Sequence, residues 1–210
     1  IMINNKYIAI EGAIGVGKTT LAKTISNTMK CQTLFEDYID NPFLKKFYDE
    51  NQSNSFSTQL YFLLKRIDQS EKINRTNDML ISDFYFGKDE LFAKLNLSEL
   101  EFEMYSSIRQ KLNFIPPLPD LIIYLQASTD ILIERIKKRG LDVEKNIKKK
   151  YIESVNDLYM KHFHEYTSSP VLIINTSNVN INDQNDYQLL IEEISSDING
   201  KKYFNPSSIK

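Results

Sequence analysis

The glycine-rich run "EGAIGVGKTT", residues 11–20, constrains the fold of this 210-residue chain more than any other feature. Gly12, Gly17, Lys18 and Thr19 match the pattern G-x-x-x-x-G-K-[ST], with the apolar stretch "YIAI" before them and a helical pattern after them. The glycines let successive backbone N–H groups turn inward toward phosphate oxygens, and the start of the helix adds the positive end of its dipole. The sequence therefore predicts a strand, a phosphate-binding loop and a helix, in this order.

This loop has the pattern of a P-loop, which assigns a role to several of its residues. Lys18 would reach the β- and γ-phosphates of ATP as a catalytic cation, and Thr19 would bind Mg²⁺. Asp83 ends the run "MLISD", where a strand-end carboxylate either lies at the ligand crevice as a second metal ligand or only caps the next turn. We expect the ATP contacts to be Gly12, Ala13, Ile14, Gly15, Val16, Gly17, Lys18, Thr19 and Thr20. Glu11, directly before the loop, is expected to be a structural strand-end acid.

Short apolar runs alternate with longer helical patterns along the chain. The runs are rich in β-branched residues and lack polar alternation, which is typical of parallel strands buried on both faces. We expect strands at residues 7–11, 32–36, 79–83, 121–126 and 171–175. The sequence thus predicts an α/β P-loop NTPase fold, a five-stranded parallel sheet flanked by helices. It predicts a single domain over residues 1–210, with a flexible polar tail from about residue 198 to 210.

Composition excludes several classes of protein. The chain has 26 Lys and Arg against 28 Asp and Glu, and this balance argues against a general nucleic-acid binder. Cys31 is the single cysteine, so the chain has no internal disulfide framework and no cysteine-based zinc site. No apolar run approaches the roughly 18 residues of a membrane span, and the N-terminus lacks a signal-peptide pattern. We expect a cytoplasmic protein without a membrane or nucleic-acid partner.

Two arginines follow the fourth predicted strand in the run "ERIKKRG". Arg135 and Arg139 are four residues apart and so share one face of a helix that Gly140 ends. They could cover the transferring phosphoryl group as a helical lid and neutralise its developing charge. A solvated basic helix end, favoured by the helix dipole, explains the same pattern equally well.

The acceptor of the phosphoryl group has to be inferred from residues beyond the loop. Glu36 ends the second predicted strand, where it either accepts a proton from an attacking hydroxyl or simply faces solvent. Gln59 and Arg66 are seven residues apart, on one helix face, and an amide can read the edge of a heterocycle. A buried Arg66 would need an acid, for which Asp89 is the candidate. Phe92 is one of several aromatics that could line a pocket or belong to the core.

Several segments together resemble the deoxynucleoside kinase family. The run "EDYIDNPFLKKFYDE" is similar to an E-x(4)-NPF-x(3)-FY segment of that family. The Gln59-to-Arg66 spacing, "LISDFYFGKDELFAKLN" and "LIIYLQAS" resemble it as well. The resemblance runs from the first strand to about Tyr151. It lies in the deoxycytidine/deoxyguanosine kinase-like group, closest to the bacterial deoxyadenosine/deoxyguanosine kinase branch.

The resemblance implies transfer of the γ-phosphoryl group of ATP to the 5′-hydroxyl of a deoxyribonucleoside in nucleotide salvage, with purines weakly favoured. It implies that Glu36 is the base at the 5′-hydroxyl and that Arg135 and Arg139 are lid arginines over the donor phosphates. It also implies Mg²⁺ with ATP, and a homodimer. The substrate-binding residues that it implies are Glu36, Tyr48, Gln59, Arg66, Asp89, Phe92 and Glu144, with Tyr48 and Glu144 at the 3′-hydroxyl, Gln59, Arg66 and Asp89 at the base, and Phe92 stacked.

The chain departs from the family pattern at two positions. Phe84 stands where the family usually carries an arginine directly after the strand-end acid. Our hypothesis is that Lys88, one turn further on, supplies the missing positive charge and contacts the substrate, because a phosphoryl-transfer site needs that cation. Leu141 stands where many relatives carry a third lid arginine, so the lid would depend on Arg135 and Arg139 alone.

Two other functions remain open at the level of sequence. A nucleoside monophosphate kinase of the thymidylate kinase type shares the loop and the sheet, but it needs an arginine for the acceptor phosphate, and Phe84 occupies the obvious position. A non-catalytic NTP-binding regulatory protein needs no sugar-and-base pocket, which Glu36, Tyr48, Gln59 and Glu144 together suggest. The sequence does not reveal the preferred base, the preferred phosphoryl donor, or inhibition by a deoxynucleoside triphosphate.

Overall fold

A computed structural model describes residues 6–49, 54–76, 78–177, 179 and 183–206 of the chain. Its centre is a six-stranded sheet in the order β2-β3-β1-β4-β5-β6, and every neighbouring pair is parallel. The strands are β1 (Tyr7–Gly12), β2 (Gln32–Leu34), β3 (Leu80–Ser82), β4 (Leu121–Gln126), β5 (Val171–Asn175) and β6 (Lys201–Phe204). The predicted α/β class and parallel sheet are confirmed.

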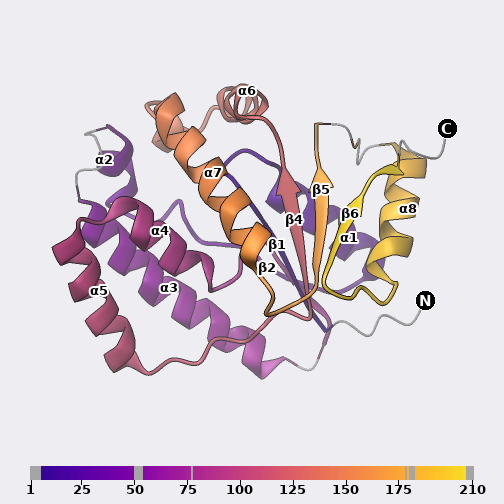
Figure 1. The fold of residues 1–210 in the computed structure, drawn as a ribbon, viewed down its shortest axis with the longest axis horizontal. Coiled ribbons are helices and arrows are strands. Elements are labelled where there is room, and N and C mark those ends of the chain that lie inside the picture. The colour runs from indigo at the N-terminus through magenta and orange to yellow at the C-terminus, as the bar shows by residue number, and fades with distance from the viewer. Residues whose placement is uncertain (1–5, 50–53, 77, 178, 180–182, 207–210) are drawn as a thin grey trace.

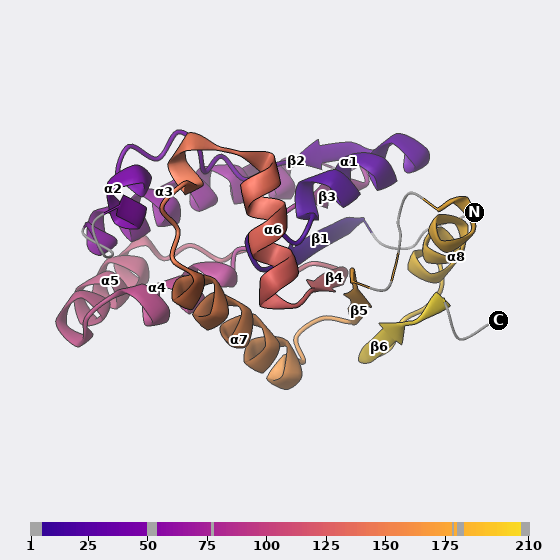
Figure 2. The same ribbon diagram turned by 90° about the horizontal axis from the view of Figure 1, so that it is seen from above.

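Helices cover both faces of this sheet. In Figures 1 and 2, α1 and α8 lie on one face, and α3, α4 and α7 lie on the other. The helices are α1 (Lys18–Met29), α2 (Leu44–Asp49), α3 (Ser55–Arg75), α4 (Lys88–Asn96), α5 (Glu99–Leu112), α6 (Thr129–Arg139), the 3₁₀ turn η1 (Asp142–Glu144), α7 (Lys149–Glu165) and α8 (Gln184–Ile194). None of the helices in the described ranges is long and apolar enough to cross a membrane.

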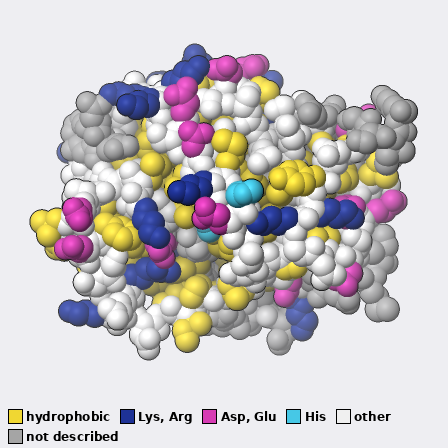
Figure 3. Space-filling model, viewed as in Figure 1, with side chains coloured by type: hydrophobic (Ala, Val, Ile, Leu, Met, Phe, Trp, Pro, Cys, Tyr) yellow, Lys and Arg dark blue, Asp and Glu magenta, His cyan; other side chains and the backbone are white. Residues whose placement is uncertain are grey.

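Two layers of helices explain why the strand sequences do not alternate. All six residues of β1 are buried, as are the first five of β4 and the first four of β5. A parallel strand between two helical layers needs apolar side chains on both sides, which continuous runs such as "LIIYL" supply. On the outside, Lys and Arg alternate with Asp and Glu over the face in Figure 3, as the near-balanced charge suggests.

The sheet has six strands rather than the five predicted, and the sixth lies within the segment predicted to be a flexible tail. Residues 201–204 form β6, which pairs with β5 in the register Val171↔Lys201 to Ile174↔Phe204. Phe204 and Ile198 are buried in the main core, and they hold this segment against the sheet. Its strand was not predicted because only one residue of "KKYF" is buried, so the segment has no apolar run. Residues 207–210 of the predicted tail lie outside the described residues.

The parallel arrangement brings the carboxyl ends of the strands to one edge. Gly12 ends β1 there, Glu36 follows β2 by two residues, and Asp83 directly follows β3. Helix α6, which carries both lid arginines, lies over this edge in Figure 1, above the arrowheads of β4 and β5. In open parallel sheets the carboxyl edge is where ligands bind.

Candidate active site

The loop after β1 is shaped by close contacts that exclude side chains. Gly12 has a φ of +144°, and a Cβ on it would collide with the backbone oxygen of Leu125 in β4. Gly15 has a φ of +83°, and a Cβ there would lie 2.9 Å from the backbone oxygen of Leu132 in α6. Glycine alone fits such positions without strain. The loop is therefore fixed between the sheet and the lid helix.

Lys18, the first residue of α1, extends back along the loop. Its Nζ donates hydrogen bonds to the backbone oxygens of Gly12 at 2.8 Å and Ala13 at 3.2 Å. Burial and the nearby charge of Lys88 lower the pKa of Lys18 to about 8, although Glu11 acts in the opposite direction. A phosphate group bound here would favour the protonated, charged form of Lys18.

Thr19 and Asp83 provide adjacent oxygen atoms beside the loop. The Thr19 hydroxyl donates to Asp83 Oδ2 at 2.5 Å, and Asp83 Oδ1 accepts a hydrogen bond from the backbone N–H of Glu36 at 2.7 Å. A hydroxyl and a carboxylate are the oxygen ligands that Mg²⁺ takes together with nucleotide phosphates. The two residues fit a magnesium site, and Asp83 also links this site to the backbone of Glu36.

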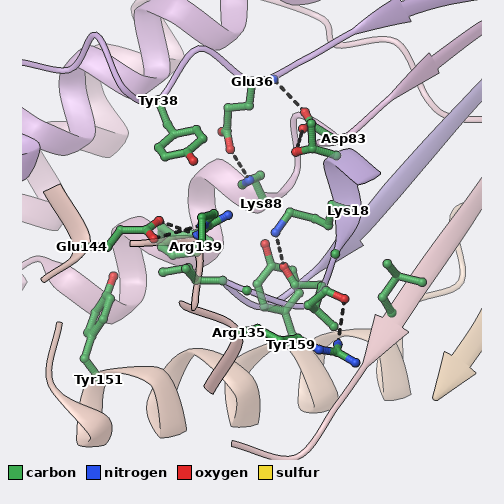
Figure 4. A pocket seen from close by; sticks show the side chains of 18 of the residues that line it. Lys18, Glu36, Tyr38, Asp83, Lys88, Arg135, Arg139, Glu144, Tyr151 and Tyr159 are labelled. Carbon is green, nitrogen blue, oxygen red and sulfur yellow. Dashed lines mark hydrogen bonds and ion pairs between the residues drawn. The ribbon is translucent and has the colours of Figure 1, made fainter. Parts of the chain in front are cut away.

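Glu36 lies between two cations, which Figure 4 shows in part. Lys88 Nζ is 2.6 Å from Glu36 Oε2, and Arg66 Nε donates to Oε1 at 2.8 Å. Burial alone would raise the pKa of Glu36, but Lys88 and Arg66 more than offset burial and lower the pKa to about 2. Glu36 is therefore a carboxylate at any physiological pH, and both of its oxygens are held in place.

Arg66 connects Glu36 to a second buried acid. Its NH1 donates to Asp89 Oδ1, so the pairing expected from the sequence is present. Gln59 Nε2 donates to Asp89 Oδ1 at 3.0 Å, and the Tyr105 hydroxyl donates to Oδ2. Burial raises the pKa of Asp89, although Arg66 and Tyr105 act to lower it. A buried ion pair of this kind depends on every member, because removal of one leaves an uncompensated charge.

The two lid arginines have different partners. Arg135 donates to the backbone oxygen of Val16 at 3.2 Å and to the hydroxyl of Thr176 at 2.8 Å, which ties the lid to the loop and to the segment after β5. Arg139 makes two hydrogen bonds to Glu144, at 2.6 and 3.1 Å. The side chain of Glu144 is 4% exposed, whereas that of Arg139 is 38% exposed. Arg139 therefore bridges from the lid to the acceptor side (Figure 4).

One cavity of about 850 Å³ joins these groups. Of the predicted site residues, all line it except Ala13 and Asp89; Ala13 is buried within the loop, and Asp89 lies behind Gln59 and Arg66. The residues that line the cavity and were predicted are Gly12, Ile14, Gly15, Val16, Gly17, Lys18, Thr19, Thr20, Glu36, Tyr48, Gln59, Arg66, Asp83, Lys88, Phe92, Arg135, Arg139 and Glu144.

Sequence reasoning missed several lining residues. Phe62 lies three residues after Gln59 and four before Arg66, so helical periodicity could have identified it. Tyr38, two residues after Glu36, turns its hydroxyl toward the space between Glu36 and Arg139 (Figure 4). The spacing of the other missed residues did not single them out from their neighbours; they include Leu44, Asn96, Tyr151, Tyr159 and Thr176.

A phosphate-binding loop that shares one cavity with a carboxylate held between two cations defines a P-loop kinase with a small-molecule acceptor. The family model described as "Deoxynucleoside kinase" matches residues 8–199, and the chain belongs to this family. The resemblance inferred from the sequence is thus confirmed, and the chain is an ATP-dependent deoxynucleoside kinase rather than a monophosphate kinase or a regulatory protein.

Individual relatives support this assignment. The chain is 39% identical to a deoxyguanosine kinase from Bacillus subtilis over 71% of this chain and 74% of the relative. It is 31% identical to a deoxyadenosine kinase from Dictyostelium discoideum over 97% of this chain and 83% of the relative. Among solved structures, the deoxyadenosine kinase from M. mycoides with bound dATP matches with a TM-score of 0.79 and 25% identity, over 90% of this chain and 100% of that one.

Proposed function

We propose that this kinase phosphorylates the 5′-hydroxyl of purine deoxyribonucleosides in nucleotide salvage, with MgATP as the donor. The observation that carries the proposal is the position of Glu36, in one cavity with Lys18 and with the Gln59–Arg66 face of α3. A hydroxyl beside Glu36 would point toward the phosphates that the loop binds. The preference for purines is supported by relatives named deoxyguanosine kinase and deoxyadenosine kinase.

Glu36 acts mainly by orienting the acceptor. A carboxylate with a pKa near 2 is a weak base, so it does not remove the proton before the reaction starts. In a loose transition state the hydroxyl forms little bond to phosphorus, and it needs only a well-placed hydrogen-bond acceptor at first. The proton passes to Glu36 late, when the oxygen has become acidic through its bond to phosphorus.

The other polar residues hold the two ends of the nucleoside. The amide nitrogen of Gln59 donates hydrogen bonds to Asp89. The amide oxygen of Gln59 therefore remains for a donor on the edge of the base. Phe92 would stack on the base, and Lys88 and Arg66 would keep Glu36 ionised and close to the sugar. Glu144 would accept a hydrogen bond from the 3′-hydroxyl, and Tyr48 also lines the cavity.

The donor side neutralises the charge of the transferring group. Thr19 and Asp83 would hold Mg²⁺, which would supply Lewis-acid stabilisation of the phosphates when bound. Lys18 would leave the backbone oxygens of the loop for the β- and γ-phosphates. Arg139 and Arg135 would cover the group from the lid, where a preorganised cation has its largest effect.

Two further features of this proposal concern the whole molecule. A homodimer is supported by apolar side chains that remain exposed on the adjacent helices α3 and α5, namely Leu64, Leu100 and Met104. Light scattering during gel filtration would measure the oligomeric state, and a monomer at micromolar concentration would contradict the dimer. We also assign the protein to the cytoplasm, because salvage kinases work where ATP is plentiful.

A substrate panel tests the proposed function. Purified protein with MgATP is assayed against the four deoxyribonucleosides, the matching ribonucleosides and the deoxyribonucleoside monophosphates. We expect the highest kcat/KM for deoxyguanosine or deoxyadenosine and formation of the 5′-monophosphate. A highest value for thymidine would overturn the purine preference, and turnover of the monophosphates alone would overturn the assignment of the acceptor.

A further inference from the structure

Glu11 was expected to be a structural residue, but its surroundings place it in the charge network of the site. The residue is 0% exposed. Its Oε2 accepts hydrogen bonds from the backbone N–H of Gly12 at 3.1 Å and from the Tyr159 hydroxyl at 2.8 Å. Its Oε1 accepts from the backbone N–H of Tyr85 at 2.9 Å and lies 3.9 Å from Lys88 Nζ. A charged group buried this deeply has to be both hydrogen-bonded and paired with a cation.

Lys88 is the cation that Glu11 shares with Glu36. Its ammonium is 3.9 Å from Glu11 Oε1 and 2.6 Å from Glu36 Oε2, and the side chain is 5% exposed. The three groups therefore form a row, Glu11–Lys88–Glu36, that leads from the strand before the phosphate loop to the expected position of the acceptor hydroxyl. The carboxylate of Glu11, at one end of this row, is fixed by the backbone N–H groups of Gly12 and Tyr85 and by the hydroxyl of Tyr159.

Lys88 occupies a position that is unfavourable for a cation unless an acid compensates. It is the first residue of α4, where the positive end of the helix dipole lies. Lys88 also has a long side chain with several rotatable bonds, so a single contact would hold it poorly. Glu11 Oε1, 3.9 Å from the Lys88 ammonium, supplies the compensating negative charge and a second contact.

We propose that Glu11 is a positioning residue for phosphoryl transfer: its carboxylate holds the Lys88 ammonium against Glu36. The inference rests on the proposed role of Glu36 at the acceptor hydroxyl. It differs from a purely structural role, in which Glu11 would only bind the N–H groups of Gly12 and Tyr85 and the hydroxyl of Tyr159.

A double-mutant cycle distinguishes the two roles. Glu11→Gln keeps the shape of the side chain and removes its charge, and we expect kcat to fall about thirtyfold. Lys88→Met should lower kcat at least as much, and the double variant should be no worse than Lys88→Met, because Glu11 acts through Lys88. Multiplication of the two losses would overturn the proposal. Glu90→Gln, the same change at a half-exposed acid of α4, is the control and should alter kcat less than about twofold.

Nucleotide binding gives a second readout that needs no turnover. A positioning role at the reacting groups lowers kcat, so Glu11→Gln should change the affinity for a non-hydrolysable ATP analogue less than about threefold. A loss of this affinity as large as the loss of kcat would overturn the proposal. Should Glu11→Gln fail to fold, Glu11→Asp, which keeps the charge but draws it back by one methylene group, takes its place in the cycle. If the substrate panel identifies another acceptor, the same cycle measured with that acceptor still tests Glu11, so the two proposals fail separately.

Discussion

The donor loop and the acceptor pocket are built in different ways. The loop binds through backbone groups of consecutive residues, and its shape depends on glycines packed against β4 and α6. The acceptor pocket depends on charged side chains from three separate segments, in the chain Lys88–Glu36–Arg66–Asp89. A backbone cradle tolerates many side-chain changes but no added Cβ, whereas a buried charge network fails when one partner is lost. The two halves should therefore respond to opposite kinds of mutation.

Removal of one charge should have the largest effect, on the acceptor side. Glu36→Gln keeps the size of the side chain but loses the acceptor of the hydroxyl proton and leaves Lys88 and Arg66 without their shared partner. We expect kcat to fall about a thousandfold, with a much smaller change in KM for the nucleoside. Steady-state kinetics would measure both values. Asp37→Asn, at the exposed neighbouring acid, is the control; an unchanged kcat in Glu36→Gln would remove Glu36 from the mechanism.

Addition of one methyl group should damage the donor side. In Gly12→Ala the new Cβ meets the Leu125 backbone oxygen at a φ that L residues rarely adopt. We expect kcat/KM for ATP to fall about a hundredfold and the protein to lose about 1–3 kcal/mol of stability. Kinetics and thermal unfolding would test this. Gly200→Ala is the matched control, because it has a positive φ but open space around it; equal losses in both variants would show that strain alone explains the effect.

The lid arginine that reaches the acceptor side should give an intermediate effect. Arg139→Ala removes a cation from the donor phosphates and also leaves the buried Glu144 without its ion pair. We expect kcat to fall about thirtyfold and KM for the nucleoside to change as well. Lys137→Ala, two residues earlier and exposed, should change neither value. A change in KM for ATP alone would confine Arg139 to the donor side.

The smallest expected effect needs no mutation. Because the pKa of Lys18 is about 8, the fraction that carries a proton falls as pH rises from 7 to 9. Only the protonated form attracts phosphate, so the affinity for a non-hydrolysable ATP analogue should be about tenfold weaker at pH 9 than at pH 7. Nucleoside binding should vary much less over this range, since the pKa of Glu36 is about 2. Isothermal titration at several pH values would compare the two, and parallel losses would contradict the assignment to Lys18.

The difference between the two halves also explains what the sequence could reveal. The donor loop is a local pattern, so its residues could be identified from ten consecutive letters. Arg66 and Asp89 could be paired only as a hypothesis, because the contact joins α3 to α4 through tertiary packing. Glu11 was taken for a structural acid since nothing near it in sequence indicates Lys88 or Tyr159 as partners. Strand β6 was missed because a strand at the edge of a sheet needs few apolar residues.

The pairing of Arg139 with Glu144 has a consequence for the order in which substrates add. Each residue has a proposed ligand of its own, the donor phosphates for Arg139 and the 3′-hydroxyl for Glu144, yet the two side chains bond to each other. A nucleoside that takes up the oxygens of Glu144 would weaken this pair and make the arginine available to phosphate. By thermodynamic reciprocity, a nucleotide that draws Arg139 away would leave the oxygens of Glu144 available to a hydroxyl donor. We therefore expect the free energies of the two binding steps to be linked, so that a filled acceptor pocket raises the affinity for ATP.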